Sequence, residues 1–317
     1  MTSRTITADA AGTWTLVDLP VNRIGFGAMR LTGSAAFHLG TPSDRAQSIA
    51  VLRRAVELGV NHIDTAAFYF SSLRSANELI NSALAPYADD LVIVTKVGPY
   101  RDYSGDWGTP ARPDRLRGHV EENLRQLGRD HLDVVNLRWM EGWDSIAEHF
   151  GALAELREAG LIRHLGISGV EPRQLAEAQA IAPVVCVQNQ YGLHAPDPDA
   201  DELLRLCGEQ GIAFVPFFAV AGQGGARGPA GEELDEVRTV ARAHGATPAQ
   251  VRLAWTLQQG PHVLAIPGTG SPDHLAENVA AGALRLTDDE MMRLNTVRLQ
   301  GGSPSRRSGA APSPRPA

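Results

Sequence analysis

Three residues suited to proton transfer occur in two short segments of the chain. Residues 61–69 read NHIDTAAFY and contain Asp64 and Tyr69, and residues 91–98 read LVIVTKVG and contain Lys96. A phenol has a pKa of about 10 in water, and a nearby ammonium group favours its ionised form. A buried ammonium in turn needs a carboxylate partner. If the fold brings the three side chains together, Tyr69 becomes a general acid for a carbonyl oxygen.

Each of the three residues also has an ordinary structural interpretation. An aspartate at the end of a strand often caps the following turn, a tyrosine in a loop usually packs against the core, and a lysine at a strand end reaches solvent. The chemical hypothesis therefore depends on the elements that position the three side chains.

Short segments rich in Val and Ile alternate with longer helical patterns along the chain. Strands that alternate with helices pair in parallel, and eight such units in about 250 residues are typical of a (β/α)8 TIM barrel. A doubly wound open sheet is the alternative, but it needs a topological switch and usually has fewer units. The predicted strands are residues 23–27, 60–64, 91–96, 132–137, 162–168, 184–189, 212–217 and 263–268. The predicted helices are residues 43–59, 75–87, 112–128, 145–160, 171–182, 198–211, 232–245, 247–260 and 271–282.

The two ends of the chain lie outside this alternation. Residues 13–23 (TWTLVDLPVNR) predict a strand that enters a turn, or a hairpin that closes the floor of the barrel. Residues 301–317 (GGSPSRRSGAAPSPRPA) have no apolar periodicity and are predicted to be a disordered tail. The expected organisation is one barrel domain over residues 1–300, followed by this tail.

A barrel places the carboxyl ends of all its strands at one mouth, where active sites of this fold lie. Neighbouring strands are about 4.8 Å apart, so side chains at their ends converge. Polar or aromatic residues stand at or just after six of the predicted strand ends: Asp64, Lys96, Arg138, Ser168, Gln188 and Phe217, with Tyr69 in the loop after Asp64.

Composition restricts the function further. The chain has 317 residues, is 43% hydrophobic and carries a net charge of −7. The body of the chain has no block rich in Lys and Arg, which argues against nucleic-acid binding. No apolar run approaches the ~20 residues of a membrane helix, and neither the two cysteines nor the ten histidines have metal-ligand spacing. We expect a cytoplasmic protein that acts on a small molecule without a metal; its oligomeric state stays open.

The chain resembles the aldo-keto reductase family across almost its whole length. Four motifs carry the resemblance in the expected order: HIDTAAFY, VTKVG, HLGISGV and VCVQNQY. They lie between GFGAMRLTG near residue 25 and IPGTGSPDHLAEN near residue 270. The resemblance implies that Tyr69 is the acid/base, that Lys96 lowers its pKa and that Asp64 holds Lys96.

Arg138 stands where the family usually has a histidine. Arginine cannot shuttle a proton, because its pKa exceeds about 12. We hypothesise that Arg138 holds an anionic or phenolate oxygen of the substrate and favours the Tyr69 phenolate; alternatively, it only pairs with a loop acid such as Glu141. NLRWM and FVPFFAVAG resemble a bacterial subgroup that includes pyridoxal reductases, whose substrate has an aldehyde beside an ionisable ring hydroxyl. Three tryptophans of nearby loops are expected either to line an aromatic pocket or to pack in the core: Trp107, Trp139 and Trp143.

A hydride donor is needed, and the expected cofactor is NADPH. The chain has no complete G-x-G-x-x-G fingerprint, but GQGGARG (222–228) and GTGSPDH (268–274) follow strands seven and eight, where barrels of this kind bind phosphates. The resemblance implies that Ser168 and Gln188 bind the nicotinamide carboxamide, with Phe217 on the ring and Gly169 in place of the usual Asn. NADH is the alternative, because Gly268 and His274 replace the basic pair that often grips the 2′-phosphate. The remaining predicted cofactor residues are Gly27, Met29, Phe218, Val220, Gly222, Pro267, Thr269, Ser271, Glu277 and Asn278.

Three functions are compatible with these patterns. The first is an NADPH-dependent oxidoreductase that reduces a small aromatic aldehyde or ketone, such as pyridoxal. The second is a ketoreductase that tailors a secondary metabolite, and the third is a nicotinamide-binding subunit with little turnover. The intact set of Asp64, Tyr69 and Lys96 favours an enzyme.

Overall fold

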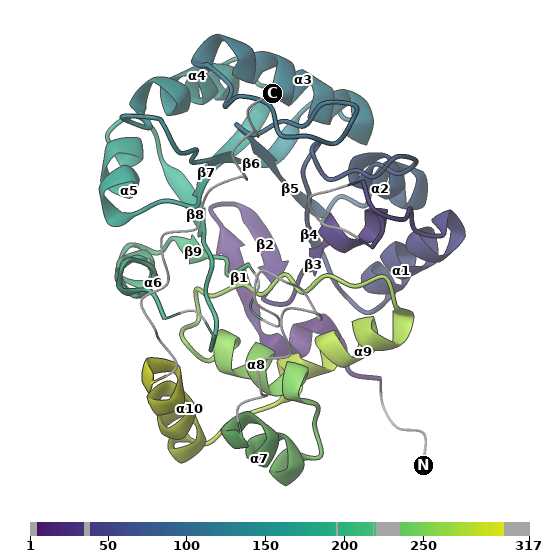
Figure 1. Cartoon of the computed structure of the whole chain (residues 1–317), viewed down its shortest axis with the longest axis vertical. Helices are drawn as coiled ribbons and strands as arrows, with labels where there is room; N and C mark the ends of the chain where they lie inside the picture. The colour runs from purple at the N-terminus through teal and green to yellow at the C-terminus, as the bar shows by residue number, and fades with distance from the viewer. Residues whose placement is uncertain (1–4, 35–38, 195, 218, 220–234, 301–317) are drawn as a thin grey trace.

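The computed structural model describes residues 5–34, 39–194, 196–217, 219 and 235–300. In this part of the chain a curled parallel sheet is surrounded by helices (Figure 1), with the strand order β3-β4-β5-β6-β7-β8-β9. The strands are β3 (Phe26–Gly27), β4 (His62–Asp64), β5 (Val92–Val97), β6 (Leu132–Arg138), β7 (Ile162–Ser168), β8 (Val184–Gln188) and β9 (Ala213–Phe214).

The eighth predicted strand closes the barrel without forming a continuous ladder. The Leu264 amide donates to the Phe214 carbonyl at 2.9 Å, and the Ala265 amide donates to the Arg23 carbonyl at 2.8 Å. Residues around 264 therefore lie between β9 and the start of β3, joined to both by single bridges. The prediction of a TIM-type barrel is confirmed, but the strands at this seam are shorter than predicted. Pro216 and Pro267 have no amide hydrogen to extend the ladders.

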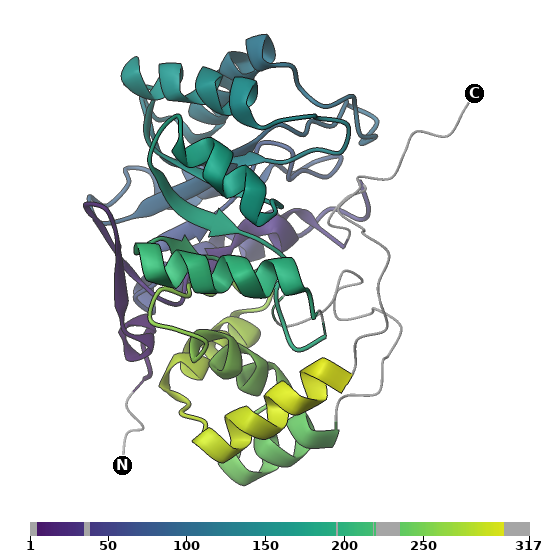
Figure 2. The same cartoon turned by 90° about the vertical axis from the view of Figure 1, so that its left-hand side faces the viewer.

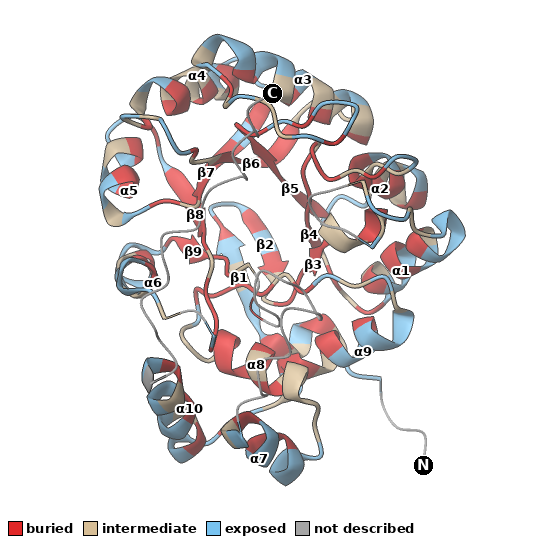
Figure 3. Cartoon of the chain, in the orientation of Figure 1, coloured by how far each residue is buried: buried red, intermediate tan, exposed pale blue. Residues whose placement is uncertain are grey.

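Helices form the outer ring, and those next to the sheet, such as α4 and α8, carry many buried residues (Figure 3). Side-chain caps begin several of them: Ser75, for example, accepts a hydrogen bond from the Glu78 amide at 3.4 Å. The helices are α1 (Arg45–Glu57), α2 (Ala76–Leu84), α3 (Leu116–Leu127), α4 (Ala147–Glu158), α5 (Pro172–Gln179), α6 (Pro198–Gln210), α7 (Asp235–His244), α8 (Pro248–Leu257), α9 (Pro272–Ala280) and α10 (Asp288–Gln300). Short 3-10 turns cover Ala8–Ala11, Ala28–Thr32, Pro113–Arg115 and Ala281–Ala283.

Helix α10 is an element that the sequence analysis did not predict. Its start nevertheless carries a capping signal, since the Thr287 amide donates to the Glu290 carboxylate at 2.8 Å and the Glu290 amide donates to the Thr287 hydroxyl at 3.3 Å. This reciprocal pair is a capping box. The predicted tail, residues 301–317, lies outside the described residues.

The N-terminal hairpin closes the end of the barrel opposite the strand carboxyl ends, as predicted. Strands β1 (Thr13–Leu16) and β2 (Leu19–Asn22) pair antiparallel, and Figure 2 shows the hairpin in dark purple at one end of the barrel. Leu16, Leu19 and Val21 form one apolar cluster with residues of the barrel interior, among them Val92 and Val94. The floor of the barrel is therefore sealed by hydrocarbon.

Side-chain alternation then places polar groups at the other end. Along a strand, residues i, i+2 and i+4 share one face. Val92 and Val94 of β5 face the interior above the hairpin, so Lys96, two residues further on, faces the interior at the mouth. Asp64 and Gln188 likewise end β4 and β8.

Candidate active site

A buried ion pair forms the centre of the mouth. The Lys96 Nζ atom lies 2.7 Å from both carboxylate oxygens of Asp64 and donates a third hydrogen bond to the Thr65 carbonyl at 3.1 Å. Asp64 is 4% exposed and Lys96 is 6% exposed. Burial alone would lower the pKa of Lys96, but the charges and hydrogen bonds of Asp64 and Tyr69 outweigh it and raise that pKa. Lys96 is therefore held as an ammonium ion.

A second layer of buried amides holds the two strands that carry this pair. Thr65 and Thr95, the neighbours of Asp64 and Lys96, face away from the barrel interior. The Thr65 hydroxyl donates to Asn77 Oδ1 at 2.7 Å, and the Thr95 hydroxyl donates to Asn123 Oδ1 at 2.6 Å. Asn77 also donates to Asn123 Oδ1 at 2.9 Å, which joins helices α2 and α3 to the strands. Fully satisfied buried networks of this kind favour one geometry.

Tyr69 lies against Lys96, as the hypothesis requires. It is 7% exposed, its ring centroid is 5.0 Å from Lys96 Nζ, and its hydroxyl interacts electrostatically with the lysine. Burial raises the pKa of Tyr69, while Lys96 and Arg138 act to lower it and Asp64 acts to raise it. The contribution of Lys96 has the expected, lowering direction, but burial outweighs it and the net pKa of Tyr69 is raised. Removal from water outweighs the nearby cations.

Gln188 forms hydrogen bonds with two other buried residues of the site. Its Nε2 donates to Asp64 Oδ1 at 2.8 Å, and its Oε1 accepts a long hydrogen bond of 3.5 Å from Asn136. Gln188 is fully buried. The contact with a nicotinamide stays a prediction, and among the described residues the partner of Nε2 is the carboxylate that holds Lys96.

Arg138 is half-buried at the end of β6, directly beside β7. Its guanidinium carbon lies 5.4 Å from the centroid of the Phe217 ring, and its charge interacts with Tyr69. The Nη1 atom is buried and has no hydrogen-bond acceptor among the described residues. The alternative of a salt bridge to Glu141 is wrong, because Glu141 is exposed and makes no ion pair with Arg138 in the described part of the chain.

The absence of a side chain at Gly169 makes room for this guanidinium. A Cβ atom placed on Gly169 would lie 1.8 Å from Arg138 Nη1 and 2.4 Å from its guanidinium carbon. Gly169 has a φ of +68°, and its amide donates to Asn189 Oδ1 at 2.9 Å. The Val170 amide donates to the same oxygen at 3.1 Å. Asn189, which the sequence analysis did not select, thus fixes the turn against which Arg138 packs.

Two of the predicted cofactor glycines lie where the barrel closes. A Cβ atom on Gly27 would lie 2.5 Å from the Ile266 carbonyl, and one on Gly268 would lie 2.4 Å from the Gly27 carbonyl. The close approach of the two backbones explains both glycines without a ligand. Gly268 is also exposed, so its backbone remains accessible at the mouth.

Helix α9 begins next to the place where the barrel closes, and side-chain hydrogen bonds cap its first turn. Ser271 caps it, accepting a hydrogen bond from the His274 amide at 3.4 Å, and the Ser271 amide donates to the Thr269 hydroxyl at 3.0 Å. Thr269 and Ser271 are half-buried, and His274 and Glu277 are exposed. Of the other predicted cofactor residues, Ser168, Pro267 and Asn278 are buried, Met29 and Phe217 are half-buried, and Phe218, Val220 and Gly222 lie outside the described residues.

The three tryptophans are partly buried and pack against the core. Trp139 and Trp143 meet edge to face with centroids 5.8 Å apart, and Trp143 stacks on His149 at 3.7 Å. Trp107 lies 5.8 Å from the ring of Phe68, the neighbour of Tyr69. Core packing therefore applies to all three, and Trp107 is also close to the catalytic loop.

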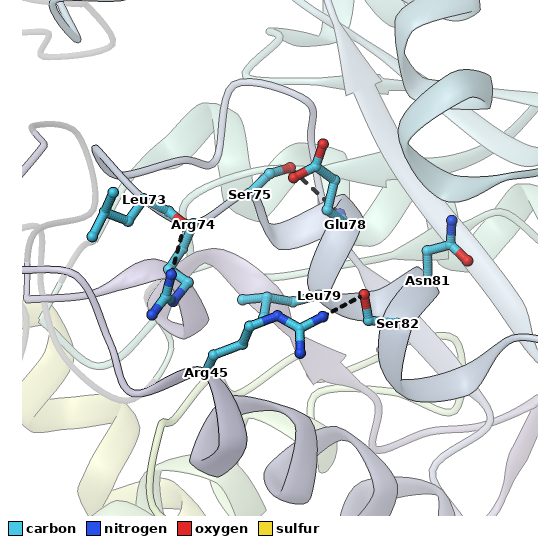
Figure 4. Close-up of a pocket in the computed structure, with 8 residues that line it drawn as sticks. All are labelled: Arg45, Leu73, Arg74, Ser75, Glu78, Leu79, Asn81 and Ser82. Carbon is cyan, nitrogen blue, oxygen red and sulfur yellow. Dashed lines mark hydrogen bonds between the residues drawn. The ribbon is translucent and has the colours of Figure 1, made fainter.

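One hollow among the described residues lies away from the mouth. It has a volume of about 290 Å³ and lies beside helix α2, with Arg45 reaching across to the Ser82 hydroxyl at 2.9 Å (Figure 4). Its lining comes from α1, α2 and the turn before α2, and contains none of the predicted site residues. The described residues hold no cluster of His, Cys, Asp or Glu suited to a metal ion. No helix in the described ranges is long and apolar enough to cross a bilayer.

The Aldo/keto reductase family matches residues 23–298 of the chain. The chain belongs to the aldo/keto reductase family. Members of the family are oxidoreductases, which agrees with a buried tyrosine, lysine and aspartate at the mouth of the barrel. A relative from Escherichia coli (strain K12), named pyridoxine 4-dehydrogenase, is 45% identical over 295 residues and covers 91% of this chain and 99% of its own.

Two further relatives extend this comparison. An uncharacterized oxidoreductase of Schizosaccharomyces pombe is 36% identical over 293 residues, covering 92% of each chain. The crystal structure of an aldo-keto reductase from Klebsiella pneumoniae in complex with NADPH superimposes with a TM-score of 0.73 at 28% identity, over 92% of this chain and 95% of that one. This aldo/keto reductase is therefore similar to its relatives along almost all of their length.

Proposed function

We propose that this aldo/keto reductase uses NADPH to reduce the carbonyl group of a small aromatic aldehyde or ketone, and that it prefers substrates with an ionised oxygen near that carbonyl, as in pyridoxal. The observation that carries the proposal is the position of the Tyr69 ring 5.0 Å from the ammonium of Lys96, with the Arg138 charge also acting on Tyr69.

Tyr69, Lys96 and Asp64 each have a different role in one proton transfer. The raised pKa of Tyr69 keeps its proton in place at neutral pH, so Tyr69 acts as the acid that protonates the carbonyl oxygen. Lys96 stabilises the phenolate that remains, because its ammonium is already in position and needs no reorganisation. Asp64 and the Thr65 carbonyl hold Lys96 in that position.

The residues at the mouth fit a nicotinamide dinucleotide. Bound NADPH would supply the hydride that reaches the carbonyl carbon. Phe217 presents a half-buried ring beside Arg138, and α9 begins beside the half-buried residues Thr269 and Ser271, at a helix N-terminus of the kind that binds phosphate. The NADPH complex of the Klebsiella relative supports the phosphorylated cofactor, whereas the exposed His274 is the one basic residue among the predicted adenosine contacts and keeps NADH as the alternative.

The surroundings of Arg138 favour a substrate with an anionic oxygen. Its buried Nη1 has no acceptor among the described residues, and a buried charged donor without a partner is costly. A substrate oxygen anion would satisfy it. The name of the Escherichia coli relative, pyridoxine 4-dehydrogenase, agrees with this chemistry, since oxidation of pyridoxine at that position is the reverse of pyridoxal reduction.

The test is NADPH oxidation, followed at the nicotinamide absorbance, with pyridoxal and with benzaldehyde, which has no ionisable oxygen. Tyr69→Phe should lower kcat/KM for both aldehydes about 1,000-fold, as expected for loss of a general acid, while NADPH binding measured by fluorescence is retained. Arg138→Met should lower kcat/KM about 10-fold or more for pyridoxal but less than 3-fold for benzaldehyde, the difference being about 1.4 kcal/mol per factor of ten.

Two results would contradict the proposal in different ways. NADPH binding without turnover of any aldehyde would favour a cofactor-binding subunit. Equal losses for pyridoxal and benzaldehyde in Arg138→Met would leave the reductase intact but remove the substrate preference.

A further inference from the structure

Arg101 lies in the loop after β5 and is not among the residues that the family motifs select. It is 7% exposed, although arginine is rarely buried without a carboxylate partner. Its partners are carbonyl groups: Nε donates to the Gly105 carbonyl at 2.9 Å, and Nη1 donates to the carbonyls of Phe68 at 3.3 Å and Phe70 at 3.0 Å. Phe68 and Phe70 are the two neighbours of Tyr69.

The backbone on both sides of Tyr69 is therefore fixed by one guanidinium group. The Tyr69 carbonyl itself accepts from the Ala76 amide at 2.9 Å, so three consecutive carbonyls of this loop are hydrogen-bonded, two of them to Arg101. Removal of Arg101 would leave the carbonyls of Phe68 and Phe70, the two neighbours of Tyr69, without this donor.

Aromatic rings enclose the same guanidinium. Its carbon lies 4.5 Å from the Phe70 ring centroid and 5.8 Å from that of Trp107, and Trp107 also contacts Phe68. Phe68 meets Tyr69 edge to face at 5.1 Å. The loop after β5 and the loop after β4 are thus packed together around Arg101, with the Tyr69 ring at one end of the aromatic cluster.

The burial of Arg101 costs free energy, so a contribution to stability does not by itself explain why this residue is an arginine. Arg101 Nη2 is buried and has no acceptor among the described residues. A Cβ atom on Gly105 would lie 2.9 Å from this nitrogen, and Gly105 has a φ of +88°. An apolar side chain of similar length would avoid the unsatisfied donor. The charged group is therefore better explained by the geometry that it imposes on the loop.

We infer that Arg101 is a positioning residue that holds Tyr69 in its place beside Lys96. This conclusion rests on the proposed role of Tyr69 as the acid. A displacement of about 1 Å at a reacting group can lower a rate about 100-fold. Arg101 acts on the backbone of Tyr69 and touches neither substrate nor the reacting atoms.

The experiment compares Arg101→Met and Arg101→Lys with the control Arg112→Met. Arg112 is an exposed arginine that pairs with Asp114 at 2.9 Å and belongs to no part of the site. With pyridoxal and NADPH as probes, we expect Arg101→Met to lower kcat about 100-fold, with the Kd for NADPH close to that of the wild type. Arg101→Lys should retain the fold but lose about 10-fold in kcat, because one ammonium cannot reproduce the fork of the guanidinium. Arg112→Met should match the wild type.

A double variant separates positioning from general damage. In a Tyr69→Phe background, Arg101→Met should change the residual rate less than 3-fold, because residues that act as a unit are not additive. An equal further loss in that background, or a wild-type kcat for Arg101→Lys, would overturn the inference. If Tyr69→Phe itself keeps full activity, the proposed function fails instead, and the two failures are told apart by the single variants.

Discussion

The floor and the mouth of the barrel are built from the same strands but are stabilised differently. On β5, Val92 and Val94 face the hairpin at the floor, and Lys96 faces the mouth on the same side of the strand. At the floor, apolar contacts with Leu16 and Leu19 stabilise the fold without requiring directional partners. At the mouth, Lys96 is tolerated only because Asp64 and the Thr65 carbonyl accept its hydrogen bonds.

The difference shows how one strand can serve stability at one end and chemistry at the other. Apolar residues tolerate small shifts, since their contacts are many and individually weak. A buried charge tolerates few shifts in position, because each lost partner leaves an unpaired group in a medium of low dielectric constant. We therefore expect substitutions at the mouth to change both stability and turnover, and substitutions at the floor to change stability alone.

The largest effect is expected at the mouth, from Lys96→Met. The substitution leaves Asp64 buried with only the Gln188 amide as a partner, so the free energy of unfolding should fall by about 3 kcal/mol and turnover should be lost. The double variant Asp64→Asn/Lys96→Met removes both charges and should regain most of that stability while staying inactive. Urea unfolding and NADPH oxidation measure the two quantities. Equal stability of the single and double variants would contradict the account of the buried pair.

A smaller effect on stability, with no effect on turnover, is expected at the floor from Leu16→Ala. Leu16 is buried between the hairpin and the barrel interior, and removal of a buried leucine side chain lowers stability by about 2 kcal/mol where the site can relax. The kcat with pyridoxal should stay within 2-fold of the wild type. A large loss of kcat would show that the floor and the mouth are coupled.

The third prediction concerns His62, which lies between the two ends. Both its ring nitrogens are buried without a hydrogen-bond partner among the described residues, and the gap that it lines holds only about 10 Å³, no more than one water molecule. Burial lowers the pKa of His62 to about 4. Between this value and about 6.5 the unfolded chain binds a proton that the folded protein does not, so stability falls as the pH is lowered through that range.

From pH 7 to pH 5 this difference amounts to about 2 kcal/mol of unfolding free energy. Urea unfolding at the two pH values should show the loss in the wild type and a smaller loss in His62→Leu, which has no group to titrate at this position. The same pH dependence in both proteins would mean that other groups cause it.

Much of the architecture was predictable because it depends on local patterns. The Val- and Ile-rich segments and their spacing predicted a barrel, and the strand ends predicted that Asp64, Lys96, Arg138 and Gln188 would meet at one mouth. The capping box of α10 at Thr287 and Glu290 was equally local and was missed. The shortened strands at the seam were not foreseen, although Pro216 and Pro267 give their cause.

The sequence by itself determined which chemical groups are present and the order in which they reach the mouth, since strand periodicity and the direction of a parallel barrel follow from the order of residues alone. The tertiary structure decided which of those groups pack together, which form hydrogen bonds and how they shift one another's pKa values. Only the packed distances show that Gly169 makes room for Arg138, that Gln188 serves Asp64, and that burial outweighs the cations around Tyr69. The reason is physical: a hydrogen bond or a pKa depends on separations of a few ångströms and on the exclusion of water, and both are set by segments far apart in the chain.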